Sequence, residues 1–420
     1  MNVLIRSAEI IDRHSPYHGE TKNLLIEDGV ITRVSDKAIK ADKVIEGSHL
    51  KVSIGWMDMR VLTGDPGHEQ TEDIKSICAA AANGGFTAIA TLPNTKPGVQ
   101  TKDVIYSLKA RSAQYLTDVH PMASVTLNNE GKDMTEMIDL HHAGAVAFTD
   151  GHKPLWHSDV MLKSLQYMQP FDGLLINHCE DLYLNHSGQM HEGKTSTVLG
   201  LKGLPRLSEE LMVQRDLSIL EYTGGRLHIA HISSPRSLDM IREAKKKGLK
   251  VSCDIAAHQL MLDDTMLAEF DTNLKVNPPL RSKQDIEAYW KALADHTIDV
   301  IVSDHIPVDV EGKKLEFDLA DFGINGIETM FSVVNTANKR MKIENLVSRF
   351  TEAPRNLLRM PLPKIEEGAK ANLTVFDPEL NWLVKEKDLR SRSRNNPFIG
   401  MELQGRAVAV LNNGQVIVNE

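Results

Sequence analysis

Apolar and polar residues alternate in short stretches at both ends of the chain. Residues 1–50 contain the runs MNVLIR, KNLLIEDGVITRVSD and KVIEG, and turn-forming residues separate them. Residues 366–420 repeat this pattern, and the pair Asn413-Gly414 is a strong signal for a two-residue hairpin turn. We therefore expect residues 1–50 and 366–420 to form one small β-sandwich domain from both chain termini.

Strand-like and helix-like stretches alternate in the middle of the chain. The stretch 71–85, for example, has acids in its first turn and ends in Gly84-Gly85, which predicts a helix. Eight such strand-helix units within residues 51–365 predict an α/β fold, a TIM (β/α)8 barrel. The alternative is a doubly wound sheet, but no glycine-rich phosphate turn follows the first strand. The predicted barrel strands are 55–61, 87–94, 123–128, 145–150, 174–180, 227–233, 250–255 and 299–305.

Composition and charge narrow the class of protein. The chain has 420 residues, of which 41% are hydrophobic and 25% are charged, as in globular proteins. Its net charge of −9 is spread along the sequence, which argues against nucleic acid or an anionic membrane as partner. Three distant cysteines form no disulfide framework. Together with the lack of a signal-peptide pattern and of a long apolar run, this predicts a cytoplasmic protein.

Four candidate functional residues stand at the ends of predicted strands. They are Asp150, His178, His231 and Asp304, and the carboxyl ends of barrel strands carry the active site in TIM barrels. Two imidazoles and a carboxylate can hold a catalytic zinc ion with one open position. We therefore predict a site for one metal at Asp150, His178 and His231, with Asp304 transferring protons. Taken singly, each residue could equally be a hydrogen-bonded structural residue.

Longer motifs follow the strands along nearly the whole chain. They are GGFT (84–87), LPNTKP (92–97), AVAFTD (145–150), NHCED (177–181), HIAHISS (228–234), NPPLR (277–281), SDH (303–305), FGINGIET (322–329) and NPF (396–398). In these motifs the chain resembles dihydroorotases of the long bacterial and multifunctional-complex type, in the amidohydrolase superfamily. The resemblance implies zinc as cofactor and dihydroorotate as substrate. It also implies these roles: Asp150, His178 and His231 as metal ligands, Asp304 as proton carrier, and Asn94 and Asn277 as substrate contacts.

The first predicted strand departs from the family pattern. Dihydroorotases carry Asp-x-His-x-His-x-Arg there, before Pro-Gly, whereas this chain has Arg60 and Leu62 at the histidine positions. Gly64 replaces the arginine that holds the substrate carboxylate, and Val308 replaces a further family histidine. We expect at most one metal ion, because a leucine side chain has no donor atom.

Arg60 also suggests why the metal would be absent. If its side chain points inward like the histidine it replaces, the guanidinium lies near the carboxylates of Asp150 and Asp304. A fixed cation would then neutralise buried carboxylates in place of a metal.

Two functions therefore remain open. The first is a dihydroorotase-like protein of pyrimidine biosynthesis with a degenerate metal site. Its role would be structural or regulatory, with aspartate transcarbamoylase as partner and a homodimer as the default assembly. The second is a one-zinc cyclic amide hydrolase that converts dihydroorotate to N-carbamoyl-L-aspartate or opens a related ring. Residues 182–205 would be a lid or a mobile connection.

Overall fold

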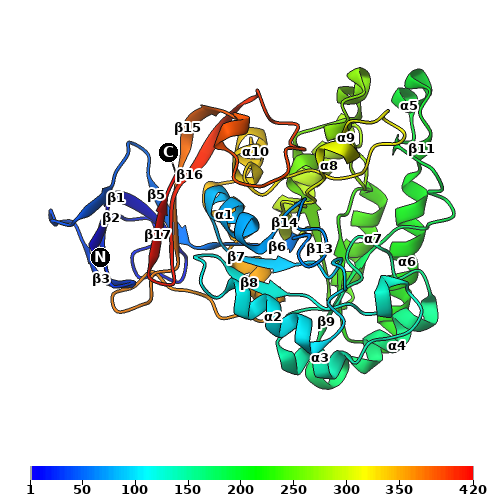
Figure 1. The fold of residues 1–420 in the computed structure, drawn as a ribbon, viewed down its shortest axis with the longest axis horizontal. Coiled ribbons are helices and arrows are strands. Elements are labelled where there is room, and N and C mark those ends of the chain that lie inside the picture. The colour runs from blue at the N-terminus through cyan, green and yellow to red at the C-terminus, as the bar shows by residue number, and fades with distance from the viewer. Residues whose placement is uncertain (1, 420) are drawn as a thin grey trace.

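The two ends of the chain meet in one hydrogen-bonded sheet, seen as blue and red strands side by side in Figure 1. The computed structural model describes residues 2–419. The strand order is β17-β16-β15-β5-β1-β2-β3, and β4 pairs with β1. The strands are β1 (Asn2–Ile11), β2 (Thr21–Glu27), β3 (Val30–Ser35), β4 (Lys43–Ile45), β5 (Lys51–Ile54), β15 (Leu373–Leu383), β16 (Glu402–Asn412) and β17 (Gln415–Val418).

Apolar and polar residues alternate along these strands, and the apolar residues form a separate core for the terminal domain. Val3, Ile5, Val52 and Leu373 are all buried in one apolar cluster, although they come from opposite ends of the sequence. The hairpin between β16 and β17 turns at Asn413-Gly414, where both residues have positive φ, as predicted. The predicted fold of a barrel with a β domain from both termini is confirmed. The division at residues 50 and 366 stays a prediction.

The middle of the chain forms the barrel. All of its neighbouring strands are parallel, and a bridge between Val61 and His305 joins the first barrel strand to the segment that follows the last. The strands are β6 (Trp56–Val61), β7 (Phe86–Thr91), β8 (Asp118–Pro121), β9 (Leu174–His178), β12 (Arg226–Ala230), β13 (Val251–Ala256) and β14 (Val300–Val302), with short β10 (Met190–His191) and β11 (Gly203–Leu204) outside them.

Two predicted barrel strands need correction. The third is β8, at residues 118–121 rather than 123–128, and the fourth shrinks from 145–150 to Phe148, which bridges Ala123 and Leu175. The reason is a side chain: one carboxylate oxygen of Asp150 accepts hydrogen bonds from the backbone amides of Val125 (3.0 Å) and Thr126 (2.9 Å). Those amides are therefore unavailable for pairing between strands.

Helices surround the barrel. The helix α1, for example, begins at a capping box of Asp73 and Ser76 and is followed by Gly85 with φ of 99°. No helix within residues 2–419 has the length and apolar character needed to cross a membrane. The helices are α1 (Ile74–Gly84), α2 (Lys102–Ser112), α3 (Met137–Ala143), α4 (Ser158–Tyr167), α5 (Lys194–Leu199), α6 (Arg206–Thr223), α7 (Pro235–Lys246), α8 (Lys283–Ala294), α9 (Val310–Lys313), α10 (Met330–Ala337), α11 (Ile343–Ser348) and α12 (Glu352–Leu357).

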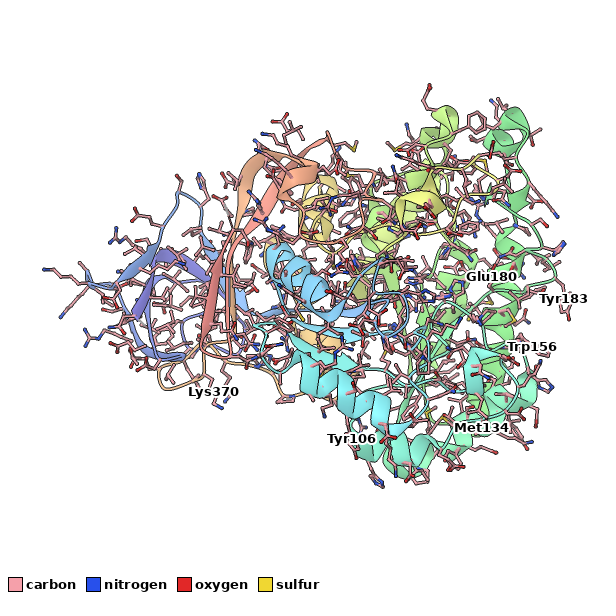
Figure 2. All side chains as sticks on the ribbon, viewed as in Figure 1. Tyr106, Met134, Trp156, Glu180, Tyr183 and Lys370 are labelled. Carbon is pink, nitrogen blue, oxygen red and sulfur yellow. The ribbon has the colours of Figure 1, made fainter. Side chains whose placement is uncertain are left out.

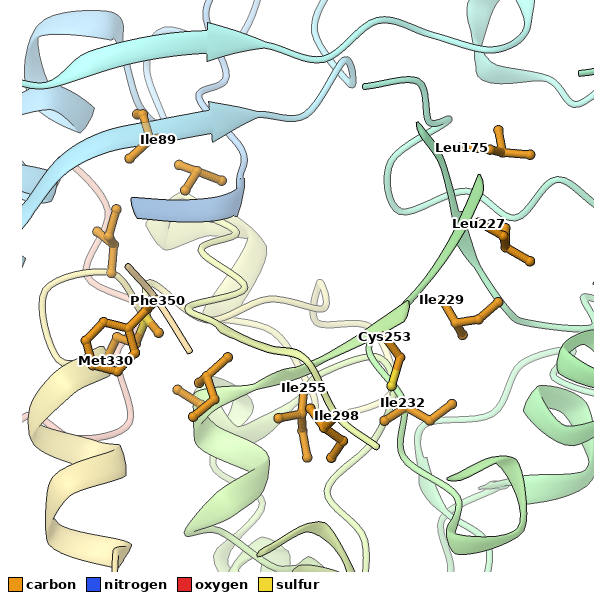
Figure 3. Packing of buried hydrophobic residues seen from close by; sticks show 14 of the residues in the cluster. Ile89, Leu175, Leu227, Ile229, Ile232, Cys253, Ile255, Ile298, Met330 and Phe350 are labelled. Atoms are coloured by element: carbon orange, nitrogen blue, oxygen red, sulfur yellow. The ribbon is translucent and has the colours of Figure 1, made fainter. Parts of the chain in front are cut away.

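Alternate residues of several barrel strands pack in two different cores. Leu175, Ile229 and Ile255 belong to the core that includes residues of the surrounding helices, as Figure 3 shows for several of its members. Their neighbours, such as Ile176 and Ala230, belong to a second core. This period of two fixes which side chains at the strand ends can face the barrel axis.

Trp56 connects the barrel to the terminal domain. Its side chain is fully buried, and the indole nitrogen donates to Ser53 Oγ at 3.0 Å. Four phenylalanine rings surround it with centroids 4.8–5.8 Å away. These rings are Phe86 on β7, Phe331 on α10, Phe350 after α11 and Phe376 on β15.

We predict that Trp56→Ala lowers the free energy of unfolding by about 3 to 5 kcal/mol, because it opens a cavity where the two parts meet. Urea denaturation followed by circular dichroism measures this. The exposed Tyr222→Ala serves as control and should change stability by less than about 0.5 kcal/mol. Equal effects of the two substitutions would contradict the role given to Trp56.

Candidate functional site

Arg60 extends from β6 into the barrel mouth. Only 3% of its side chain is exposed, and Nε lies 3.5 Å from Oδ1 of Asp304. Nη2 donates to the carbonyl of Gly151 at 3.4 Å. Burial lowers the pKa of Arg60, and the charges of Asp304, Asp254 and Asp58 oppose this. Arg60 thus reaches Asp304, as hypothesised, but it makes no ion pair with the carboxylate of Asp150 among the described residues.

A chain of buried groups leads from Asp304 into the strands. His231 Nε2 lies 3.0 Å from Asp304 Oδ1, and Nδ1 lies 3.2 Å from Asp254 Oδ1. The second oxygen of Asp254 lies 2.9 Å from Nε2 of His228, whose Nδ1 is 2.8 Å from Ser252 Oγ. Burial opposes ionisation of Asp254, yet the two histidines hold its pKa below the usual range. Burial and the charge of Arg60 lower the pKa of His231.

His231 and Asp304 both have left-handed backbone conformations. Their φ angles are 53° and 49°, a region that non-glycine residues rarely adopt. The backbone amide of His231 donates to Asp254 Oδ1 at 2.8 Å, which helps to hold this conformation. Strain of this kind is typical of functional sites, where surrounding contacts determine the backbone.

Glu180 binds two of the predicted site residues. Its Oε2 lies 3.0 Å from His178 Nε2 and accepts from Asn277 Nδ2 at 2.8 Å, while Oε1 accepts from Asn185 at 2.6 Å. Burial opposes ionisation, but His178 and the two amides lower the pKa of Glu180 to about 2. The ring centroids of His178 and His231 are 6.0 Å apart. Figure 2 shows Glu180 in the barrel part of the molecule, away from the terminal sheet.

Asp150 and Asn94 form hydrogen bonds with the backbone of the loops at the strand ends. Asp150 accepts from the amides of Val125 and Thr126 with one oxygen and from the Thr126 hydroxyl with the other. Burial raises the pKa of Asp150 to about 6. Asn94 donates to the backbone carbonyl of Asp150 at 2.9 Å and accepts from the amide of His152 at 3.3 Å.

The chain is similar to known proteins over its full length. A family model described as dihydro-orotase-like matches residues 50–237. The dihydroorotase of Syntrophus aciditrophicus is 38% identical over 100% of both chains. That of Pelotomaculum thermopropionicum is 40% identical over 100% of this chain and 99% of the relative. The chain belongs to the dihydroorotase family.

A solved structure agrees with this fold. The L-hydantoinase of Arthrobacter aurescens superimposes with a TM-score of 0.86 at 23% identity, covering 99% of this chain and 96% of that one. The D-hydantoinase of a Thermus species gives a TM-score of 0.81 at 23% identity, over 99% and 95% of the two chains. The likeness is in the arrangement of the barrel and the β domain.

The ligand-type side chains at this dihydroorotase-type site are not grouped around one metal position in the described part of the chain. His231 Nε2 faces Asp304, His178 Nε2 faces Glu180, and the carboxylate of Asp150 is bound to its own loop. Within residues 2–419, no three His, Cys, Asp or Glu side chains converge in a way that could hold a metal. The Arg60 guanidinium adds a fixed positive charge beside Asp304.

Leu62 and Gly64, the other two positions that depart from the family pattern, make backbone contacts within the fold. The amide of Leu62 donates to the carbonyl of His305 at 2.9 Å, where the barrel closes. Gly64 has φ of 67°, and a Cβ atom there would lie 2.7 Å from the carbonyl oxygen of His68 and from Oγ1 of Thr71. An arginine at position 64 would therefore require the loop to move.

The sequence prediction missed three residues of this site, of which Asp254 and His258 are buried and Glu180 is partly exposed. Glu180 lies within the NHCED motif and Asp254 lies on a predicted strand, so both could have been found by the strand-end criterion. His258 follows β13, and its pKa is lowered to about 4 by burial, while the charge of Asp304 opposes the shift. Its position facing the site depends on the 3₁₀ turn after β13, which the sequence pattern does not reveal.

We predict that Arg60→Met destabilises the protein by about 3 to 5 kcal/mol, because it leaves the buried carboxylate of Asp304 without its cation. Combined with Asp304→Asn, the loss should be smaller than the sum of the two single losses. Urea denaturation of the four proteins in this cycle measures the coupling. Strict additivity would show that the two side chains do not interact.

Proposed function

We propose that this member of the dihydroorotase family does not hydrolyse dihydroorotate and acts in the cytoplasm as a structural or regulatory protein of de novo pyrimidine biosynthesis. One observation carries the proposal: the Arg60 guanidinium lies beside Asp304, the carboxylate expected to move the proton. A proton carrier needs a carboxylate that is free to bind and release a proton. Here Asp304 faces both a guanidinium, which does not deprotonate, and His231.

Electrostatics also disfavours zinc at this place. At an effective dielectric constant of 20, a dication about 4 Å from a guanidinium is repelled by about 8 kcal/mol. Asp304 would have to compensate this repulsion while remaining paired to Arg60. The substrate side is weakened as well, since Gly64 leaves no arginine for a substrate carboxylate. Losing one charge-assisted hydrogen bond of this kind weakens binding about 10- to 150-fold.

The first test measures metal content and activity together. We expect the purified protein to contain well under one zinc per chain and to show no ring opening of dihydroorotate above background, with zinc added. The dihydroorotase of Syntrophus aciditrophicus, assayed under the same conditions, is the positive control. Turnover that is abolished in Asp304→Asn would overturn the proposal in favour of a one-zinc cyclic amide hydrolase that uses Asp150, His178 and His231.

An exposed apolar surface supports the structural role. Leu207 and Leu211 lie one turn apart on α6 and are exposed, and Tyr183 is 88% exposed. Trp156 joins this surface, since its carbonyl accepts from Arg215 of the same helix at 2.7 Å. Figure 2 shows Trp156 and Tyr183 on the same side of the molecule. Exposed aromatic and aliphatic groups of this kind are typical of protein interfaces.

We extend the proposal to aspartate transcarbamoylase as the partner that covers this surface. Light scattering after size-exclusion chromatography should show a complex when the two proteins are mixed. Tyr183→Ser should weaken it by about 30-fold, as expected for a buried aromatic anchor. The control is Tyr106→Ser on α2, an exposed tyrosine away from this surface.

Two results would contradict this assignment. A complex that survives Tyr183→Ser unchanged would place the interface elsewhere. A homodimer that forms without aspartate transcarbamoylase and is lost in Tyr183→Ser would assign the surface to a second copy of this chain.

A further inference from the structure

A cavity lies at the opposite end of the barrel from Arg60. It has a volume of about 440 Å³ and is bounded by the barrel strands β7 and β8, the segment after α12 and the terminal sheet. Asp118 and His120 line it from β8, and Asn372 and Asn412 line it from the terminal segments. The volume is within the range of small-molecule sites, and junctions of this kind are common places for them.

Arg355 presents an unpaired buried cation to this cavity. The residue is 2% exposed, and Nη1 donates to the carbonyl of Thr351 at 2.9 Å. It forms no ion pair within residues 2–419, Asp118 acts on it only as a nearby charge, and its other nitrogens bond to no described group. Nε and Nη2 are not fully enclosed by protein atoms, so they face the cavity. Buried arginines are usually paired, whereas this one has only the nearby charge of Asp118 and no ion pair among the described residues.

The remaining charges of the lining are mostly positive. Lys364 and Lys370 are exposed at its edge, and Lys370 forms no ion pair with the described residues. Figure 2 shows Lys370 beside the terminal sheet. The one acid of the lining, Asp118, accepts from the side-chain amides of Asn412 (3.0 Å) and Asn413 (2.9 Å). Lys364 is paired with Glu366 at 3.7 Å, so two basic groups without an ion pair among the described residues, Arg355 and Lys370, face one acid.

One wall of the cavity is apolar. It consists of the segment from Met360 to Pro363 together with Ala88 and Ala369. Burial lowers the pKa of His120 to about 4, so its ring is neutral at pH 7 and offers one donor and one acceptor. A ligand that fills this space would combine an anionic group with a flat or aliphatic part.

We propose that this cavity is a binding site for a small organic anion, with a phosphate or carboxylate group on Arg355 and Lys370 and an apolar part against residues 360–363. Arg355 supplies the planar donor pair that binds either group in a bidentate manner. The buried cores of the barrel separate this site from Arg60 and Asp304, so it is independent of the proposed function.

Titration calorimetry with phenyl phosphate, benzoate and inorganic phosphate tests the site. We expect one phenyl phosphate or benzoate per chain, bound more tightly than inorganic phosphate, which cannot use the apolar wall. Arg355→Lys should weaken binding about 10- to 150-fold. Lys370→Ala should weaken it about 2- to 5-fold. Lys291→Ala, an exposed lysine on α8, is the matched control and should leave binding unchanged.

The outcomes distinguish a site for phosphate esters, a site for carboxylates and the absence of a site. Binding of phenyl phosphate but not benzoate would identify phosphate esters, and the reverse would identify carboxylates. If neither binds, or if Lys291→Ala weakens binding as much as Lys370→Ala, the proposal is wrong. Should Arg355→Lys lose its circular dichroism signal, the double variant Lys364→Ala/Lys370→Ala, which changes only exposed groups, decides instead.

Discussion

The buried positive charge of Arg60 is the constraint on which the barrel mouth depends. A guanidinium removed from water must be balanced, and Asp304 and Asp254 supply that balance from two other strands. His231 then lies between these two carboxylates, with each ring nitrogen close to one of them. The side chains predicted as metal ligand and proton carrier therefore lie beside one another and beside a fixed positive charge. Both ring nitrogens of His231 and Oδ1 of Asp304 are buried without a hydrogen bond to a described group, so charge rather than hydrogen bonding holds this cluster.

This network also accounts for the strained backbone at the strand ends. Left-handed conformations at His231 and Asp304 cost energy, and they persist only where several contacts fix the chain. The hydrogen bond that the backbone amide of His231 donates to Asp254 Oδ1 provides one such contact, and the closure of the barrel provides others. A barrel of parallel strands can hold such positions because its core residues, anchored at Trp56, set the strands rigidly. Packing around Trp56 at one end of the barrel thus helps to hold the left-handed backbone of His231 and Asp304 at the other end.

Local patterns predicted most of the fold and only part of the site. Alternation revealed the terminal sheet, Asn413-Gly414 revealed its hairpin, and strand-helix periodicity revealed the barrel. The third and fourth barrel strands were misplaced because Asp150 captures the backbone amides that would otherwise pair, an effect of tertiary contact. For the same reason, the sequence could place His178 at a strand end but could not show that its partner is Glu180.

Overall sequence identity and the chemistry of the site depend on different sets of residues. Identity of 38–40% over the full length assigns the family. The expected chemistry depends on a few positions, and the chain departs from the family pattern at three of them, Arg60, Leu62 and Gly64. At Gly64 the loop packs within 3 Å of the place where a Cβ atom would stand, so an arginine there would require the loop to move. Family membership therefore fixes the fold, whereas the chemistry of the site has to be argued from its particular side chains.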